Sequence, residues 1–206
     1  MHEIFQRTTV IPVVTVTHAA DAVPLGKALL RAGLRLVEVT LRTPESLAAI
    51  TAIARELPDM VVGAGTVLTP ADVTRAAEAG ARFLVSPGLT QDLVAAGLAC
   101  ELPYIPGAVT PSEIIAAREH GFSLLKFFPA IASGGTEALR QLAPVFPGIA
   151  FCPTGGLNDG NAGDFLALPN VAMVGGAWMA PTDAITAGDW AGIEEKARRA
   201  ARLGRG

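Results

Sequence analysis

The chain alternates eight times between a short apolar run and an alanine-rich amphipathic segment, at a spacing of roughly 20 to 26 residues. The apolar runs are rich in Val, Ile and Leu, and they predict strands at residues 10–16, 36–40, 61–66, 83–86, 104–105, 124–128, 149–152 and 171–174. The intervening segments predict helices at residues 21–33, 44–57, 70–79, 91–98, 111–120, 135–142, 162–168 and 190–202.

This alternation predicts an α/β fold with a parallel sheet, because nearly continuous apolar strands need helices on both faces. Eight units favour closure as a (β/α)8 TIM barrel, with residues 1–206 as one compact domain and with short loops. An open doubly wound sheet is the alternative, and it would gather its glycine-rich turns at one switch point. Here such turns follow the third, seventh and eighth strands, which a ring explains better.

Composition narrows the range of partners. The net charge is -3 and the sequence pI is near 5.6, which gives no electrostatic reason to bind nucleic acid or an anionic membrane. The apolar runs are too short to cross a bilayer, and residues 1–7 lack the apolar stretch of a signal peptide. Cys100 and Cys152 form no metal-type cluster. A cytoplasmic protein that needs no metal is the expectation.

Lys126 is the most unusual of the three lysines, because it lies inside the apolar strand at residues 124–128. A buried ammonium is costly, so this side chain must either pair with a carboxylate or be held as the neutral amine. A neutral amine can attack a carbonyl and form a Schiff base. The alternatives are a lysine that reaches out to water from the strand end and a structural ion pair.

Glu38 is the second unusual charge, since it lies in the middle of the second predicted strand. It is either a general acid/base or half of an ion pair with Arg42 or Arg35. Arg42 ends the same strand, where a guanidinium could grip a carboxylate or simply remain solvated.

Glycine-rich turns follow three strands, at residues 63–66, 153–156 and 175–177. In barrels of this kind the loops after strands seven and eight often bind phosphate through backbone N–H groups. Ordinary turn chemistry is the alternative. Trp178 and Phe127 are interpreted as packing residues, whereas Phe128 could line the pocket.

Several motifs occur in the order found in one enzyme family. They are Val37-Glu38-Val39-Thr40-Leu41-Arg42-Thr43, Gly63-Ala64-Gly65-Thr66-Val67, Ser86-Pro87-Gly88, Lys126-Phe127-Phe128-Pro129-Ala130 and Cys152-Pro153-Thr154-Gly155-Gly156. With these motifs the chain resembles the family of aldolases that act on 2-keto-3-deoxy-6-phosphogluconate (KDPG) and 4-hydroxy-2-oxoglutarate (KHG). The resemblance runs from the first strand through Pro181.

The resemblance implies a class I aldolase, a homotrimer without metal or organic cofactor, that releases pyruvate from a keto-acid substrate. Lys126 would form the Schiff base and Glu38 would move protons. The implied substrate-binding residues are Arg42, Thr66 and Thr154 for the carboxylate, Gly155, Gly156, Gly176 and Ala177 for the phosphate, and Pro87 and Phe128 in the pocket.

The chain departs from the family at two positions. Relatives commonly have serine where Ala177 stands, and often an acidic residue where Ile131 stands. These departures keep one alternative open, a non-catalytic or engineered trimeric scaffold of the same fold. A separate alternative is another phosphate-binding barrel enzyme, which keeps the loops after strands seven and eight but gives Lys126 no covalent role.

Overall fold

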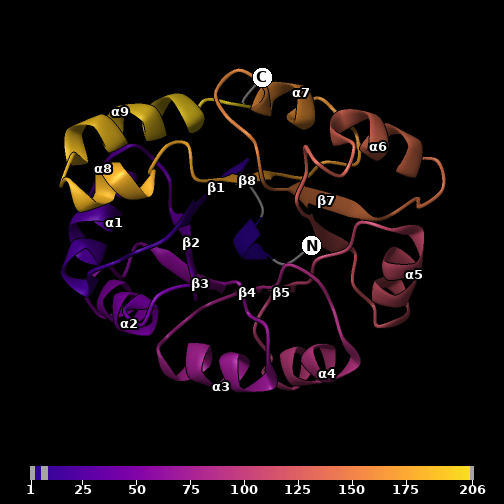
Figure 1. Cartoon of the computed structure of the whole chain (residues 1–206), viewed down its shortest axis with the longest axis horizontal. Coiled ribbons are helices and arrows are strands. Elements are labelled where there is room, and N and C mark those ends of the chain that lie inside the picture. The colour runs from indigo at the N-terminus through magenta and orange to yellow at the C-terminus, as the bar shows by residue number, and fades with distance from the viewer. Residues whose placement is uncertain (1–2, 6–8, 205–206) are drawn as a thin grey trace.

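The computed structural model describes residues 3–5 and 9–204 of the chain (Figure 1). The strands are β1 Val10–Val14, β2 Leu36–Thr40, β3 Val61–Gly65, β4 Leu84–Val85, β5 Tyr104–Ile105, β6 Leu124–Phe127, β7 Ala150–Pro153 and β8 Val174–Gly176. The α-helices are α1 Ala22–Arg31, α2 Ser46–Glu56, α3 Pro70–Glu78, α4 Gln91–Ala99, α5 Pro111–Glu119, α6 Gly135–Leu142, α7 Ala162–Leu166, α8 Thr182–Thr186 and α9 Trp190–Ala200. Figure 1 shows the helices arranged around the strands.

All the described strand pairs are parallel, which confirms the predicted α/β class. Six strands form one sheet in the order β5-β4-β3-β2-β1-β8, and β6 and β7 form a second sheet. Single bridges lie between the sheets: Gly107 pairs with Lys126 of β6, and Thr154 pairs with Gly175 of β8. The β2–β3 register places Glu38 beside Gly63 and Thr40 beside Gly65.

Three details differ from the sequence-based expectation. The last strand was predicted at residues 171–174 but is Val174–Gly176, because pairing with β1 decides its position, with Val10 opposite Val174 and Ile11 opposite Gly175. Helix α8 was not predicted, since five residues carry too little periodicity to detect. Asp21 is the N-cap position of α1 as expected, but its side chain makes no capping hydrogen bond.

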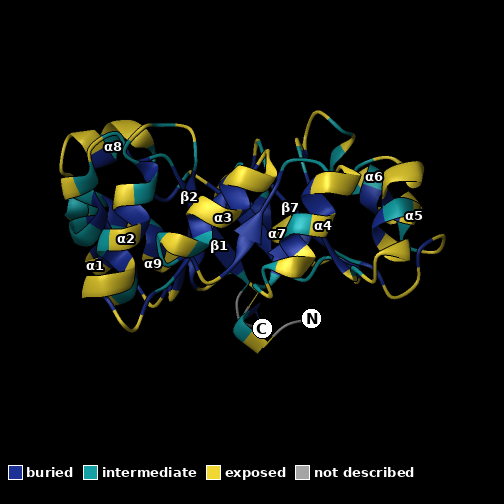
Figure 2. Cartoon of the chain, turned by 90° about the horizontal axis from the view of Figure 1, so that it is seen from below, coloured by how far each residue is buried: buried dark blue, intermediate teal, exposed yellow. Residues whose placement is uncertain are grey.

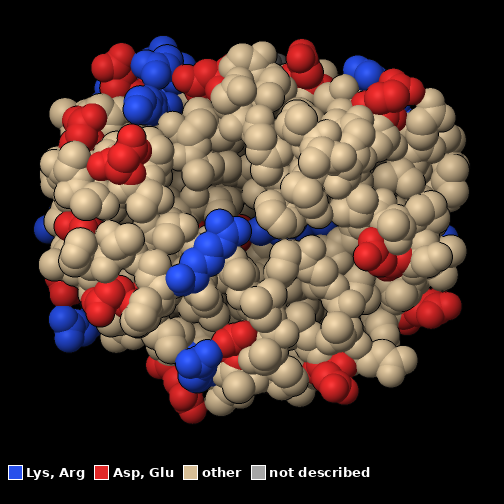
Figure 3. Space-filling model, viewed as in Figure 1, with Lys and Arg blue, Asp and Glu red and all other residues tan. Residues whose placement is uncertain are grey.

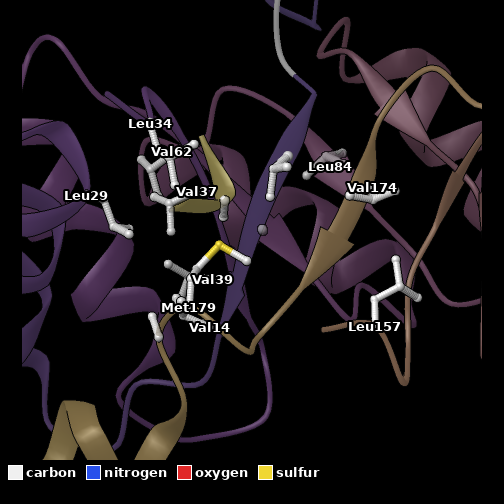
Figure 4. Close-up of a cluster of buried hydrophobic side chains, with 14 of the residues drawn as sticks. Val14, Leu29, Leu34, Val37, Val39, Val62, Leu84, Leu157, Val174 and Met179 are labelled. Atoms are coloured by element: carbon white, nitrogen blue, oxygen red, sulfur yellow. The ribbon is translucent and has the colours of Figure 1, made fainter. Parts of the chain in front are cut away.

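Two separate apolar clusters divide the interior. The larger one lies between strands and helices, and Figure 4 shows part of it, with Val14, Val37 and Val39 of the strands near Leu29 of α1. The smaller cluster draws residues from several strands into the space that they surround: Ile11, Leu36, Val85, Ile105, Leu124 and Cys152, with Phe5 and Phe83 in edge-to-face contact. Figure 2 shows the buried strands inside and the exposed residues on the outer helix faces.

Strand alternation explains how two charged side chains come to face this inner space. On β2, Val37 and Val39 face the helices, so Leu36 and Glu38 point to the opposite side. On β6, Leu125 and Phe127 face the helices, so Leu124 and Lys126 point inward as well. The period of two residues therefore directs both Glu38 and Lys126 into the interior.

Two of the described helices, α3 and α5, begin with complete capping boxes. Thr69 and Asp72 form a capping box at α3, and Thr110 and Glu113 form another at α5.

None of the described helices has the length and apolar character that crossing a bilayer requires. Residues 1–2 and 6–7, part of the stretch expected not to be a signal peptide, lie outside the described residues.

Candidate active site

Lys126 and Glu38 form a buried ion pair. The Lys126 Nζ donates a hydrogen bond to the Glu38 Oε1 at 3.1 Å, and the two side chains are only 6% and 4% exposed. Of the possibilities that the sequence left open for this lysine, the structure shows pairing with a carboxylate, and the alternative of a lysine reaching out to water is wrong. Glu38 was also considered as a partner of Arg42 or Arg35, and that pairing is wrong too. A lone buried ion pair contributes little net stability, so stability by itself does not account for it.

A glycine and an aromatic ring lie next to this ion pair. A Cβ on Gly65 would lie 2.5 Å from Glu38 Cγ and 2.6 Å from Glu38 Cδ, so only glycine leaves the carboxylate where it is. The Phe128 ring lies with its centroid 5.4 Å from the Lys126 Nζ, within the range of a cation–π contact. The pair is thus bordered by a glycine on one side and an aromatic ring on the other.

Cys152 is the register partner of Lys126 on the neighbouring strand β7. Burial, reinforced by the nearby Glu38 carboxylate, raises the pKa of the Cys152 thiol to about 12, although Lys126 and a hydrogen bond with Thr154 act in the opposite direction. This thiol therefore stays protonated at neutral pH, and it is no nucleophile beside the lysine.

A pocket of about 340 Å³ opens next to the ion pair. It is lined by Val13, Arg42, Phe128, Thr154, Gly155, Gly156, Leu157, Gly176, Ala177, Trp178 and Pro181. Two of these residues connect it to the pair: Val13 is the register partner of Glu38, and Phe128 is the ring that faces Lys126. Lys126 and Glu38 are not themselves part of the lining, but they adjoin two lining residues of a cavity large enough for a small metabolite.

Seven of the nine predicted substrate-binding residues line this pocket. Of the other two, Thr66 lies at its edge, where its hydroxyl accepts a hydrogen bond from the Arg42 Nε at 3.3 Å. Thr66 has a left-handed backbone with φ 58°, which is uncommon for a β-branched residue and typical of a constrained site. Pro87 is absent from the lining, and its backbone lies so close to Gly107 that a Cβ there would overlap it.

Three pocket-lining residues have backbone N–H groups without a hydrogen-bond partner among the described residues. Within residues 150–181, no hydrogen bond engages the backbone N–H of Gly155, Gly156 or Ala177. Gly155 and Gly156 have positive φ angles of 100° and 81°, a conformation that suits glycine and that can turn successive N–H groups toward an anion. The two predicted glycine turns therefore meet at one pocket.

The charge of the pocket lining comes from one exposed residue at the pocket mouth. Of the pocket-lining residues named above, only Arg42 carries a charge, and its side chain is exposed. Figure 3 shows basic side chains at the hollowed centre of this face, while acidic side chains lie mostly toward its margin. The arrangement favours a small anionic ligand. Within residues 3–5 and 9–204, no group of three or more His, Cys, Asp or Glu side chains could hold a metal ion.

Sequence reasoning missed four lining residues: Val13, Leu157, Trp178 and Pro181. Three of them are apolar residues without a chemical signature. Trp178 was interpreted as packing, and it does pack against the larger apolar cluster, but it also forms part of the pocket wall. Its position directly after the glycine turn at residues 175–177 was the one available signal.

Comparison with known proteins agrees with this site. The family described as KDPG and KHG aldolase matches residues 1–196. A protein of Escherichia coli K12 named KHG/KDPG aldolase is 47% identical over 191 residues, which cover 93% of this chain and 90% of that protein.

Two solved structures are also similar. The KDPG aldolase of Legionella pneumophila, with pyruvate captured as a covalent carbinolamine, has a TM-score of 0.93 at 43% identity, covering 96% of each chain. The KDPG aldolase of Zymomonas mobilis ZM4 with 3-phosphoglycerate has a TM-score of 0.91 at 40% identity, covering 97% of this chain and 94% of that one.

These similarities define the chain as an aldolase, which is a lyase. More particularly, it belongs to the KDPG and KHG aldolase family. The alternative of an unrelated phosphate-binding barrel enzyme is therefore set aside.

Proposed function

We propose that the chain is a class I aldolase that cleaves KDPG to pyruvate and glyceraldehyde 3-phosphate, and KHG to pyruvate and glyoxylate. The observation that carries this proposal is the buried Lys126–Glu38 pair next to a pocket with free backbone amides. The covalent carbinolamine of pyruvate in the Legionella relative supports an amine nucleophile.

The reaction begins with the neutral amine of Lys126. Glu38 lies within hydrogen-bond distance, so it can take the proton of the ammonium and free the amine. The amine attacks C2 of the keto acid to give a carbinolamine, which loses water and becomes a protonated imine. Substrate binding thus replaces the ion pair with a covalent bond to nitrogen.

Bond cleavage uses the imine as an electron sink. A base removes the proton of the C4 hydroxyl, the C4 carbonyl forms, and the C3–C4 bond breaks. Its electron pair moves through C3 to the imine nitrogen and leaves an enamine. Glu38, acting directly or through a water molecule, is the nearest carboxylate to Lys126 and is proposed as this base. Protonation of C3 and hydrolysis of the imine then release pyruvate and restore the amine.

The two ends of the substrate are held by different groups. We assign the carboxylate to Arg42, Thr66 and Thr154, because the guanidinium and two hydroxyl groups supply donors at the inner mouth. The phosphate is assigned to the free amides of Gly155, Gly156 and Ala177, and Gly176, whose own N–H belongs to the β1–β8 ladder, borders them in the pocket wall. The 3-phosphoglycerate of the Zymomonas relative shows that a family member accepts a phosphorylated three-carbon compound.

The wider organisation of the protein follows the same proposal. We propose that the two sheets, joined by the bridges at Gly107 and Thr154, close as one (β/α)8 barrel and that residues 1–206 form one domain. A homotrimer and a cytoplasmic location, expected from the sequence, stay predictions. Light scattering during size-exclusion chromatography measures the mass and tests the trimer.

Reductive trapping tests the central step. We expect incubation with pyruvate and borohydride to add one carboxyethyl group per chain, located on Lys126 by peptide mapping, while Lys27 and Lys196 stay unmodified. Lys126→Met removes the amine and is expected to abolish both trapping and turnover. An unmodified mass for the wild-type protein contradicts the proposal and leaves the non-catalytic scaffold as the better interpretation.

A further inference from the structure

The two amide-bearing loops of the pocket follow neighbouring strands, loop 155–161 after β7 and loop 177–181 after β8. Isolated bridges join the segments below them, Phe151 with Val171 and, nearest the loops, Thr154 with Gly175. Between these two fully described loops one hydrogen bond is formed: the Trp178 Nε1 donates to the Asp159 Oδ1 at 2.8 Å. Beyond the Thr154–Gly175 bridge, this contact is therefore the hydrogen bond that holds the two sets of amides at their separation.

Trp178 is fixed at its end of the contact. Its indole ring lies so close to Gly176 that a Cβ there would overlap the ring. The ring thus rests on the backbone of one amide-bearing segment while its N–H reaches across to the other.

Asp159 is also held in place. The Asn158 backbone N–H donates to the Asn161 side-chain carbonyl at 2.8 Å, and the Asn161 Nδ2 donates to the Gly156 carbonyl at 3.1 Å. These bonds brace the loop that carries Asp159 and connect it to Gly156, whose own N–H is free. A shift of Asp159 would consequently be transmitted to the pocket.

A carboxylate this close to a phosphate site would repel the ligand, and here it has a counter-charge. The Arg199 Nε of helix α9 donates to the second carboxylate oxygen of Asp159 at 3.4 Å. Arg199 also pairs with Glu195 at 3.0 Å, which keeps the guanidinium on this side of the helix.

We propose that Asp159 is a positioning residue for recognition of the substrate phosphate. Through the Trp178 indole it sets the spacing between the amides of loops 155–161 and 177–181, and Arg199 cancels its repulsion of the anion. This inference rests on the proposed function, because it assigns the phosphate of KDPG to these loops. It predicts that Asp159 affects the phosphorylated substrate and not the unphosphorylated one.

The test compares KDPG with KHG, which lacks a phosphate. We expect Asp159→Ala to raise KM for KDPG roughly tenfold, which corresponds to about 1.4 kcal/mol, with little change in kcat and no change in KM for KHG. Asp159→Asn keeps a carbonyl acceptor for the indole and is expected to stay near wild type. Asp164→Ala is the matched control, because it removes an exposed carboxylate of α7 that makes no side-chain hydrogen bond among the described residues. Equal changes with both substrates, or an unchanged KM for KDPG, overturn the proposal.

The role of Arg199 is tested by a double variant. Arg199→Gln leaves the Asp159 charge uncompensated and is expected to raise KM for KDPG, whereas adding Asp159→Asn restores it. A purely structural role of Arg199 would leave both Arg199 variants equally impaired, and that result refutes the electrostatic part.

A binding assay separates this inference from the proposed function. In a Trp190→Phe background Trp178 is the sole indole, and its fluorescence reports titration with inorganic phosphate. Should the wild type cleave neither substrate, the proposed function fails. In that case the phosphate titration still decides the inference on Asp159. It is refuted if Asp159→Ala binds phosphate as tightly as wild type does, and it is supported if binding is weaker.

Discussion

Gly65→Ala is the substitution that most directly tests the placement of Lys126 and Glu38, the proposed catalytic pair. Gly65 ends β3, and it is not among the glycines with positive φ, so the backbone there accepts alanine. The new methyl group would lie 2.5 Å from Glu38 Cγ and 2.6 Å from Glu38 Cδ. Comfortable contact between carbon atoms requires about 3.5–4.0 Å, so the carboxyl group must move by roughly 1 Å or more.

That movement breaks the contact with Lys126. The present Nζ–Oε1 distance of 3.1 Å is already near the long end for a hydrogen bond, so a shift of this size removes it. Loss of a positioned acid/base costs about 10²–10⁴ in rate, or about 2.7–5.5 kcal/mol in activation free energy. We expect kcat for KDPG to fall within this range. Breaking the buried pair is also expected to lower the free energy of unfolding by up to about 3–5 kcal/mol.

The assay combines steady-state kinetics with pyruvate trapping and thermal unfolding. Gly163→Ala is the neutral control, since a Cβ there meets nothing within 4 Å. Gly63→Ala is the steric control, because on the same strand its Cβ would overlap the ring of Phe83 and not Glu38. The reasoning is refuted if Gly65→Ala retains kcat within about twofold of wild type, or if Gly63→Ala lowers kcat as much at equal stability.

Three further outcomes are expected. Ala177→Ser adds a hydroxyl beside the phosphate amides and should lower KM for KDPG roughly tenfold while leaving KHG unchanged; an unchanged KM contradicts this assignment. Burial raises the pKa of Cys152 from its ordinary 9.0 to about 12, so iodoacetamide at mildly alkaline pH should label Cys100 first. The stability gained from burying the neutral thiol should be lost only as pH rises from 9.0 toward 12. Early labelling of Cys152 in mass spectra would contradict the raised pKa. Burial opposes ionisation of Asp72, but hydrogen bonds, among them those from Arg75 and Thr69, lower its pKa below 3.8, so the resulting stability is present above pH 3.8 and is lost as pH falls through the lowered pKa. Asp72→Ala should therefore lower the free energy of unfolding in urea by about 1 kcal/mol at pH 7 and by less in acid. An equal loss at both pH values would count against this.

The interior placement of Lys126 was predictable because it follows from local periodicity. A lysine between Leu125 and Phe127 on a strand must face away from the side that those residues cover. The same reasoning placed Glu38 between Val37 and Val39. What this reasoning could not supply was the pairing itself, and it offered Arg42 and Arg35 as partners of Glu38 on grounds of sequence proximity.

The anion site at the glycine turns was likewise predictable only in part. Their number and their positions after strands seven and eight indicated an anion site, and the free N–H groups of Gly155 and Ala177 agree with it. The role of Trp178 in the wall, and its contact with Asp159, left no sequence pattern, since indole and carboxylate meet across two separate loops. The start of β8 was misplaced for a related reason: strand pairing, and not hydrophobicity, determines which residues of a glycine-containing run form the ladder.

The sequence by itself determined the alternation of strands and helices, the inward direction of Lys126 and Glu38, and the family motifs, because all of these depend on residues close together in the chain. The tertiary structure alone decided that Lys126 meets Glu38, 88 positions away, and that Gly65 leaves room for the carboxylate. The physical reason is that contacts between strands depend on the order and register in which strands pair, and many pairings are compatible with the same local pattern.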